Sequence, residues 1–180
     1  MRLAAYQFGV TGDVKQNMSV LVSAVRQAAE QKADLVIFPE CAVSGYPPKN
    51  IAKAENIDFS AVDRAIKELK ELSDSLGISI ITGTAFFDSK YYNRAYLFSP
   101  GQTPKWYGKR AVENVTPFLS VNATAPFQTA PTCFVDASGK VPAECARNKE
   151  ELLIYNFEVK APDFGEKGRI RYSDLLTGRS

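Results

Sequence analysis

The sequence contains no histidine, and this absence limits the chemistry available to it. Without histidine the chain has no Ser-His-Asp or Cys-His catalytic arrangement, no histidine metal site and no usual general base near neutral pH. Any catalysis must therefore use carboxylates, lysine, tyrosine or cysteine. A carboxylate can act as the base, and a lysine can hold a thiol as thiolate or stabilise an oxyanion.

Cysteines and long apolar runs are also scarce. Three cysteines without CxxC spacing predict neither a disulfide framework nor a zinc site, and they suit a reducing compartment. No apolar stretch approaches the ~20 residues of a membrane span. Met1 leads into a strand-like segment without the features of a secretory signal. We therefore expect a cytoplasmic protein with no membrane partner, and nothing in the sequence implies a metal or another cofactor.

The sequence also lacks a large excess of charge of either sign. The chain has 22 basic and 20 acidic residues, a net charge of +2, and no basic run of the kind that binds a phosphate backbone. Nucleic acid is thus not expected as a partner. With 180 residues, 45% of them apolar and 23% charged, the composition is that of a single globular domain, which we expect to span residues 1–180.

The apolar pattern of the first half predicts strands alternating with helices. Strands are expected at 2–8 and at 35–38, where consecutive apolar residues indicate burial on both faces. Between them, Asp13 has capping spacing for an amphipathic helix that runs to about Lys32. A second helix is expected from Ser60 to Gly77.

The second half reads as strands joined by turns. Two strands at 78–87 and 91–98 form an expected antiparallel pair, and shorter strands are predicted at 118–122, 133–135 and 152–159. These elements predict an α+β (mixed α/β) fold with a β-sheet core and helices outside.

The stretch DLVIFPECAVSGYPP, residues 34–48, places a carboxylate and a thiol side by side at Glu40 and Cys41. Glu40 follows a buried strand, where a scaffold can hold a catalytic carboxylate, although a strand-end acid bonded to backbone N–H groups explains it too. Successive residues of an extended segment point to opposite sides. Cys41 is therefore interpreted as a small buried apolar side chain rather than as a partner of Glu40.

The ordered segments RLAAYQF, DLVIFPECAVSGYPP, YNRAYLFSPG, WYGK, RAVEN, PFLSVNAT and TCFVDASGKV resemble the nitrilase superfamily, the carbon-nitrogen hydrolases. The resemblance extends from Met1 to about Val159. It implies a four-layer α-β-β-α sandwich, association through helices into a homo-oligomer, and no cofactor. It also implies hydrolysis of a small amide, nitrile or carbamoyl substrate by a Glu-Lys-Cys triad.

Site residues follow from the same resemblance. Glu40 of FPE corresponds to the general base, and Lys109 of WYGK to the catalytic lysine. Tyr46 is expected to contribute to substrate binding by shaping the loop over the site. Glu113 and Asn114 of RAVEN are candidates for positioning substrate, although a helix start with solvated charges explains them equally.

The family's cysteine segment is not found. In the family a long block with the cysteine-bearing strand separates the lysine motif from RAVEN, whereas YGKRAVEN joins them directly here. We therefore expect an internal deletion near 109–113, an incomplete sandwich without a central strand and helix, and reduced stability or self-association. Cys133 and Cys145 do not follow the cysteine motif, so the chain is expected to be inactive. The alternatives are a non-catalytic homologue acting as an oligomerisation or binding module, and a defective or incompletely recorded gene product.

Overall fold

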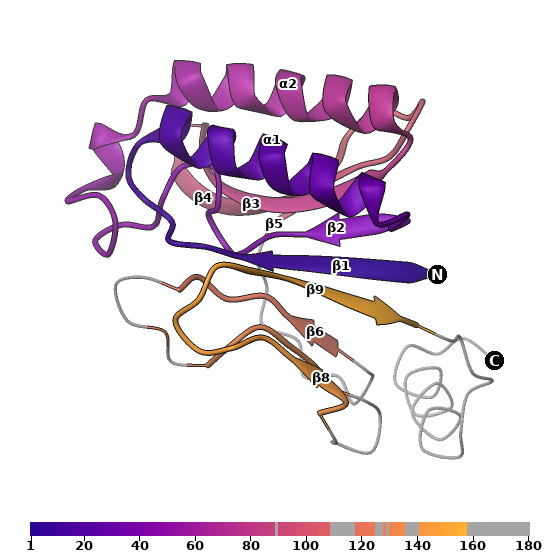
Figure 1. Cartoon of the computed structure of the whole chain (residues 1–180). Helices are drawn as coiled ribbons and strands as arrows, with labels where there is room; N and C mark the ends of the chain where they lie inside the picture. Colours follow the sequence, from indigo (N-terminus) through magenta and orange to yellow (C-terminus); the bar gives the residue numbers. More distant parts are fainter. Residues whose placement is uncertain (89, 109–117, 125–127, 129, 136–140, 158–180) are drawn as a thin grey trace, which may run out of the picture.

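The structure, a computed structural model, describes residues 1–88, 90–108, 118–124, 128, 130–135 and 141–157. Two helices cover one face of a six-stranded sheet, and a three-stranded sheet lies on its other face (Figure 1). This mixed α/β arrangement agrees with the predicted fold class. The predictions for Lys109, Glu113 and Asn114 fall outside the described residues.

The six-stranded sheet has the order β5-β4-β3-β2-β1-β9. Its strands are β1 (Arg2–Gln7), β2 (Leu35–Ile37), β3 (Ser79–Asp88), β4 (Lys90–Phe98), β5 (Lys105–Gly108) and β9 (Glu151–Asn156). The first three pair in parallel, and the other pairs are antiparallel. Pairing is continuous from one edge to the other, so the expected loss of a central strand leaves no gap in this sheet.

Helix α1 (Val14–Glu30) connects β1 to β2 and begins where the sequence predicts. The Asp13 side chain accepts hydrogen bonds from the backbone N–H groups of Lys15 and Gln16, which otherwise have no partner within the helix. The apolar face of α1 is buried against the sheet, with Leu21 and Val25 fully enclosed. Capping and periodicity thus cooperate to place this helix.

Helix α2 (Phe59–Leu76) follows a short 3-10 turn, η1 (Ala54–Asn56), and connects to β3. Its cap is Asp58, whose side chain accepts from the N–H of Ala61, so the predicted cap at Ser60 is wrong by two residues. Two polar residues with capping chemistry lie close together here, and sequence does not choose between them. Gly77 ends the helix with φ of 66°, as predicted.

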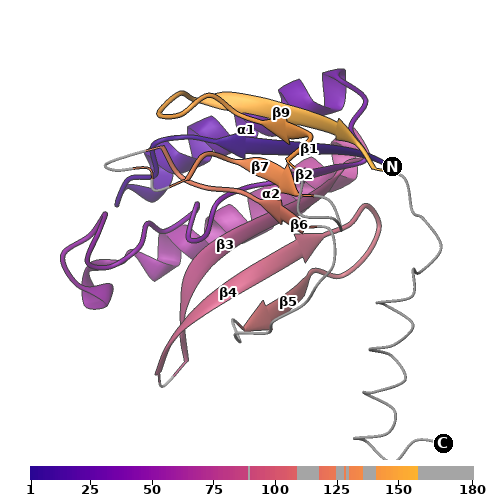
Figure 2. The same cartoon turned by 90° about the horizontal axis from the view of Figure 1, so that it is seen from below.

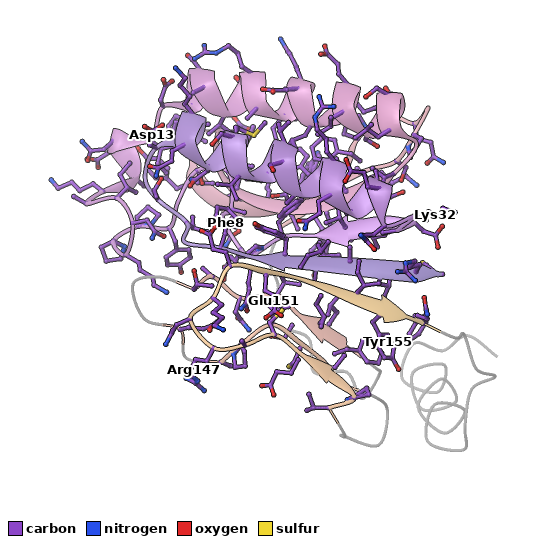
Figure 3. All side chains as sticks on the ribbon, in the orientation of Figure 1. Phe8, Asp13, Lys32, Arg147, Glu151 and Tyr155 are labelled. Atoms are coloured by element: carbon purple, nitrogen blue, oxygen red, sulfur yellow. The ribbon has the colours of Figure 1, made fainter. Side chains whose placement is uncertain are left out.

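The second sheet consists of β6 (Phe118–Ser120), β7 (Cys133–Val135) and β8 (Ala143–Glu144), all antiparallel; β6 and β7 lie side by side in Figure 2. It packs on β9 through Phe134, whose ring stacks on that of Tyr155 with centroids 4.0 Å apart. Tyr155 points from β9 toward the second sheet (Figure 3). Among the described residues no helix covers the outer face of this sheet, so three of the four expected layers are seen (Figure 1).

A buried amide joins the two sheets at the end of β1. Gln7 is fully enclosed; its Nε2 donates to the carbonyls of Ala146 and Lys149, at 2.8 and 2.6 Å. Its Oε1 accepts from Gln128 Nε2 and from the N–H of Thr132, both at 2.9 Å. Nearby, Figure 3 shows Glu151 at the start of β9, beside the loop that carries Arg147. No local sequence pattern indicates this link between the sheets, because the partners of Gln7 lie more than 120 residues away.

Candidate functional site

The loop after β2 runs along the neighbouring strand β3 instead of leaving the sheet. Three hydrogen bonds attach it: the N–H of Phe38 to the carbonyl of Ile81 (2.9 Å), the N–H of Val43 to the carbonyl of Gly83 (3.1 Å), and the N–H of Ala85 to Ser44 Oγ (2.8 Å). The turn that carries Glu40 lies between the first and second of these bonds. Its backbone is therefore fixed by the sheet.

The absence of a side chain at Gly83 allows the turn to approach this closely. A Cβ at residue 83 would lie 2.6 Å from the backbone nitrogen of Cys41 and 3.1 Å from the Cα of Glu40. Cys41 has φ of 52° and lies in a turn, so the argument from an extended backbone is wrong for this pair. Its side chain is nevertheless buried, as expected. The chain reverses here because of the contact with β3, which the local sequence does not show.

Glu40 borders a pocket of about 300 Å³ between this turn and strands β3, β4 and β5. The described lining consists of Phe38, Pro39, Glu40, Ile81, Thr82, Gly83, Asn93, Ala95 and Tyr107. The Glu40 side chain is solvent-exposed, and its Oε1 accepts a short hydrogen bond from Asn93 Nδ2. A carboxylate thus stands beside a mostly apolar cavity of a size suited to a small molecule.

The described lining of this pocket includes none of the three cysteines. Cys133 and Cys145 lie on and just after the strands of the second sheet. Burial, and secondly the Glu144 carboxylate, raises the pKa of Cys133. Burial, followed by Glu151 and smaller contributions from Cys133 and Glu144, raises the pKa of Cys145 to about 12. Both thiols are therefore protonated near neutral pH, the opposite of what a nucleophile requires.

Tyr46 lies in the next turn, away from the described pocket lining. Its backbone N–H donates to Asn50 Oδ1 at 3.1 Å, and the N–H of Asn50 donates to its carbonyl at 2.8 Å. Asn50 Nδ2 in turn donates to the carbonyl of Val10. Tyr46 is thus part of a turn fastened to the loop after β1, and its side chain is exposed. Its predicted contact with substrate remains a prediction.

Asn93 and Tyr107 are among the lining residues that sequence reasoning missed. Asn93 interrupts the aromatic and apolar segment YYNRAYLF, and strand alternation places it on the face opposite Arg94. The polar residue was a usable signal, but its partner Glu40 lies 53 residues earlier. The β4–β5 pairing that brings Tyr107 opposite Ala95 was not predicted either.

The other face of β4 carries an aromatic stack. The Arg94 guanidinium lies 3.4 Å from the ring centroid of Phe86 and 3.9 Å from that of Trp106. Trp106 and the lining residue Tyr107 are both more than half exposed. Cation–π contacts of this kind orient an arginine at a surface. Consecutive residues of β4 therefore point to opposite faces of the sheet. Asn93 lines the pocket, and Arg94 packs in the aromatic stack.

Two further classes of site are not seen in the described part of the chain. No group of three or more Cys, Asp or Glu side chains there could hold a metal ion. None of the described helices has the length and apolar character needed to cross a membrane.

Comparison with known sequences gives one family and a consistent set of relatives. The family model described as "Carbon-nitrogen hydrolase" matches residues 2–110. The glutamine-dependent NAD(+) synthetase of Synechocystis sp. is 32% identical over 108 residues, which are 54% of this chain and 19% of that protein. The enzyme of the same name from Xylella fastidiosa is 29% identical over 120 residues, 66% of this chain and 22% of that protein. The matches thus span about a fifth of the length of these relatives.

Solved structures of one amidase share the fold. A cysteine-to-serine mutant of the Nesterenkonia AN1 amidase, from the nitrilase superfamily, superposes with a TM-score of 0.77 at 15% identity. The alignment covers 99% of this chain and 97% of that one. A cysteine-to-alanine mutant of the amidase from Nesterenkonia sp. AN1, in complex with butyramide, gives a TM-score of 0.76, also at 15% identity, covering 99% and 96%. At this identity the similarity shows the fold alone.

Proposed function

Because this chain belongs to the carbon-nitrogen hydrolase family, we propose that its Glu40 pocket binds a small amide, with Glu40 in the role of the general base. The observation that carries the proposal is the position of Glu40 on a turn fixed to β3, with its carboxylate beside a pocket of about 300 Å³. The pocket is at the lower end of the ~300–1,000 Å³ range for small-molecule sites. A primary amide of a few carbons suits this volume.

The relatives support an amide as the ligand class. The relatives from Synechocystis sp. and Xylella fastidiosa are named glutamine-dependent NAD(+) synthetases, and glutamine itself carries a primary amide. The amidase with the same fold has been solved with butyramide. For this chain we propose that the alkyl part of such an amide contacts Phe38 and Ile81, and that its NH₂ group donates to the Glu40 carboxylate. Stabilisation of an oxyanion by Lys109 is a part of this proposal that depends on family resemblance alone.

We further propose that the chain does not turn over an amide by itself, because it lacks the family's nucleophile. Three observations support this. YGKRAVEN joins the lysine motif directly to RAVEN; the described pocket lining contains no cysteine; and Cys145, with its pKa near 12, carries almost no thiolate at neutral pH. Loss of one member of a catalytic unit removes most of its rate enhancement.

Two measurements on the full chain test the proposal. We expect butyramide to cause chemical-shift changes in residues around Glu40, and Glu40→Gln to weaken this binding. An absence of saturable shifts in the unaltered protein would contradict the pocket assignment. Ammonia release should not exceed that of buffer. Mass spectrometry after incubation with fluoroacetamide should show no adduct; a Glu40-dependent adduct on Cys41, Cys133 or Cys145 would overturn the proposed inactivity.

A second candidate is a non-catalytic module that associates with copies of itself. It is favoured by two exposed aromatic residues at the β3–β4 hairpin, Phe87 and Tyr91, whose ring centroids lie 4.9 Å apart and which pack with Phe59. Single exposed apolar residues are ordinary, whereas a group of them indicates an interaction surface. Light scattering at several concentrations would test it: a concentration-dependent mass supports the candidate, and a monomer throughout excludes it.

A further inference from the structure

We propose that Asn93 is a positioning residue for Glu40: its side-chain amide holds the carboxylate in the orientation that meets an amide ligand. The inference rests on the proposed function of the Glu40 pocket and adds a residue to it. The observation is the short hydrogen bond from Asn93 Nδ2 to Glu40 Oε1, which joins β4 to the turn after β2. Both residues line the same pocket.

The strand pairing gives Asn93 a fixed relation to this turn. Asn93 lies directly opposite Ala85 in the β3–β4 ladder. The N–H of Ala85 donates to Ser44 Oγ, at the far end of the same turn. One cross-strand pair therefore contacts the turn at two points: the N–H of Ala85 donates to Ser44 Oγ and holds the backbone, and the side chain of Asn93 reaches the Glu40 carboxylate. Between these two contacts, the carbonyl of Gly83 accepts a hydrogen bond from the N–H of Val43.

The chemistry of an amide donor suits this role. A free glutamate side chain samples many rotamers, and fixing it costs up to about 2 kcal/mol of entropy when a ligand must do so. A neutral N–H donor restricts the carboxylate beforehand and leaves its negative charge in place. A lysine at the same position would neutralise that charge. An aspartate would place a second carboxylate against the first and favour protonation of one of them.

A purely structural role would not need this contact. The β3–β4 hairpin is held by continuous backbone pairing from Ile80 and Phe98 to Asp88 and Lys90. The turn is held by its three attachments to β3, two between backbone groups and one from the N–H of Ala85 to the Ser44 hydroxyl. Neither set of bonds involves the side-chain amide of Asn93. Its contact with Glu40 therefore acts on the orientation of a side chain rather than on the fold.

The test uses the full chain and pairs Asn93→Asp and Asn93→Ala with the same changes at Asn156. Asn156 is exposed on β9 and faces Arg2, away from the pocket residues. Asn93→Ala removes the donor without adding charge, whereas Asn93→Asp preserves the shape and replaces the donor with a second carboxylate beside Glu40. In ¹⁵N-labelled protein the Asn93 side-chain amide resonances should shift when Glu40 is replaced by Ala, and those of Asn156 should not. Unchanged Asn93 resonances would overturn the proposal, whether or not any amide binds.

Butyramide titration supplies the functional readout. Asn93→Ala should weaken binding by about tenfold, the order expected for one partly exposed hydrogen bond to a charged group, and Asn93→Asp should weaken it at least as much because it also adds a carboxylate. Both Asn156 variants should bind like the unaltered chain. Asn93→Gln, which retains the donor, should recover part of the loss. Equal affinities for the Asn93 variants and the unaltered chain would refute the positioning role and leave the pocket assignment standing. If the unaltered chain binds no butyramide, the proposed function fails while the resonance test still decides the role of Asn93.

Discussion

Gly83 and Cys41 are in backbone contact: a Cβ added at Gly83 would lie 2.6 Å from the Cys41 nitrogen, a distance that side chains do not tolerate. The contact joins the middle of β3 to the turn that carries Glu40. It sets how closely the backbone of this turn approaches β3, beside the pocket that Glu40 and Gly83 both line. The position of a charged side chain thus depends on a residue with no side chain, 43 positions later in the chain.

Gly83→Ala should displace this turn and lower the free energy of unfolding by about 1–3 kcal/mol, because the added methyl group meets backbone atoms that cannot rotate away. It should also weaken butyramide binding. Chemical denaturation followed by ligand titration would measure both effects.

The matched control for this change is Gly77→Ala. Gly77 has φ of 66° and nothing within 4 Å of an added Cβ. Its substitution should lower the free energy of unfolding by about 1 kcal/mol, through backbone strain alone. Butyramide affinity should be unchanged in this variant. If Gly83→Ala binds the amide equally well, the turn does not depend on the close approach.

Replacement of the buried amide at the end of β1 should be among the most destabilising single changes. Gln7→Leu would leave the carbonyls of Ala146 and Lys149 and the N–H of Thr132 without their partner. Each buried group left unsatisfied costs about 1–3 kcal/mol, so a loss of several kcal/mol is expected. Thermal unfolding would measure it. Asn156→Leu, at the exposed end of β9, serves as the control and should change the midpoint little.

The stability of the protein should fall at alkaline pH through Cys145. Its pKa is about 12 in the folded chain, against 9.0 for an unperturbed thiol. The folded state therefore retains a proton that the unfolded state loses, so stability is complete below pH 9 and decreases as the pH rises toward 12. Raised pKa values of Cys133 and Tyr6 act in the same direction.

Denaturation curves between pH 7 and 11 would test this assignment. The decrease in the free energy of unfolding as the pH rises should be smaller in Cys145→Ala than in the unaltered protein. Equal pH dependence in the two proteins would show that Cys145 does not cause it. Alkylation by iodoacetamide at pH 8 should likewise be much slower in native than in denatured protein.

The aromatic stack can be followed through Trp106, the only tryptophan of the sequence. Trp106→Ala should lower stability by about 0.5–1 kcal/mol, the value of a cation–π contact at an exposed site. Arg94→Lys should cause a similar loss, because an ammonium does not stack on a ring as a guanidinium does. Tryptophan emission should respond to Arg94→Lys and stay constant in Lys105→Arg, which retains a charge nearby. An unchanged spectrum in Arg94→Lys would exclude the stack in solution.

Local chemistry predicted most of the first half of the fold. Asp13 and Gly77 mark helix ends because capping and positive φ are properties of single residues, and both predictions are confirmed. The strand before Pro39 and the hairpin from Ser79 to Phe98 are confirmed for the same reason, although in β2 only Val36 is fully buried. Ser60 was a wrong cap only because Asp58 offers the same chemistry two residues earlier.

The features of the fold and the site that were not predicted depend on contacts between segments distant in the sequence. The Glu40 turn was treated as extended, but β3 bends the chain there through Gly83, and no neighbour of Glu40 encodes that. Asn93 and Gln7 were missed because their partners lie far along the chain. The short strands β5 and β8 carry too few residues to show a period. Lys109, Glu113 and Asn114 lie outside the described residues, so their roles stay predictions.

The alternation of β4 has a consequence for how the hairpin folds. A slip of one residue against β3 would turn Asn93 outward and present the guanidinium of Arg94 to Glu40, producing an ion pair that neutralises the base. In that arrangement Arg94 would lose both Phe86 and Trp106. The rings of Phe86 and Trp106 thus stabilise the observed register of β4 against β3. Because they hold the Arg94 guanidinium on the opposite face of β4, they keep it away from the Glu40 carboxylate.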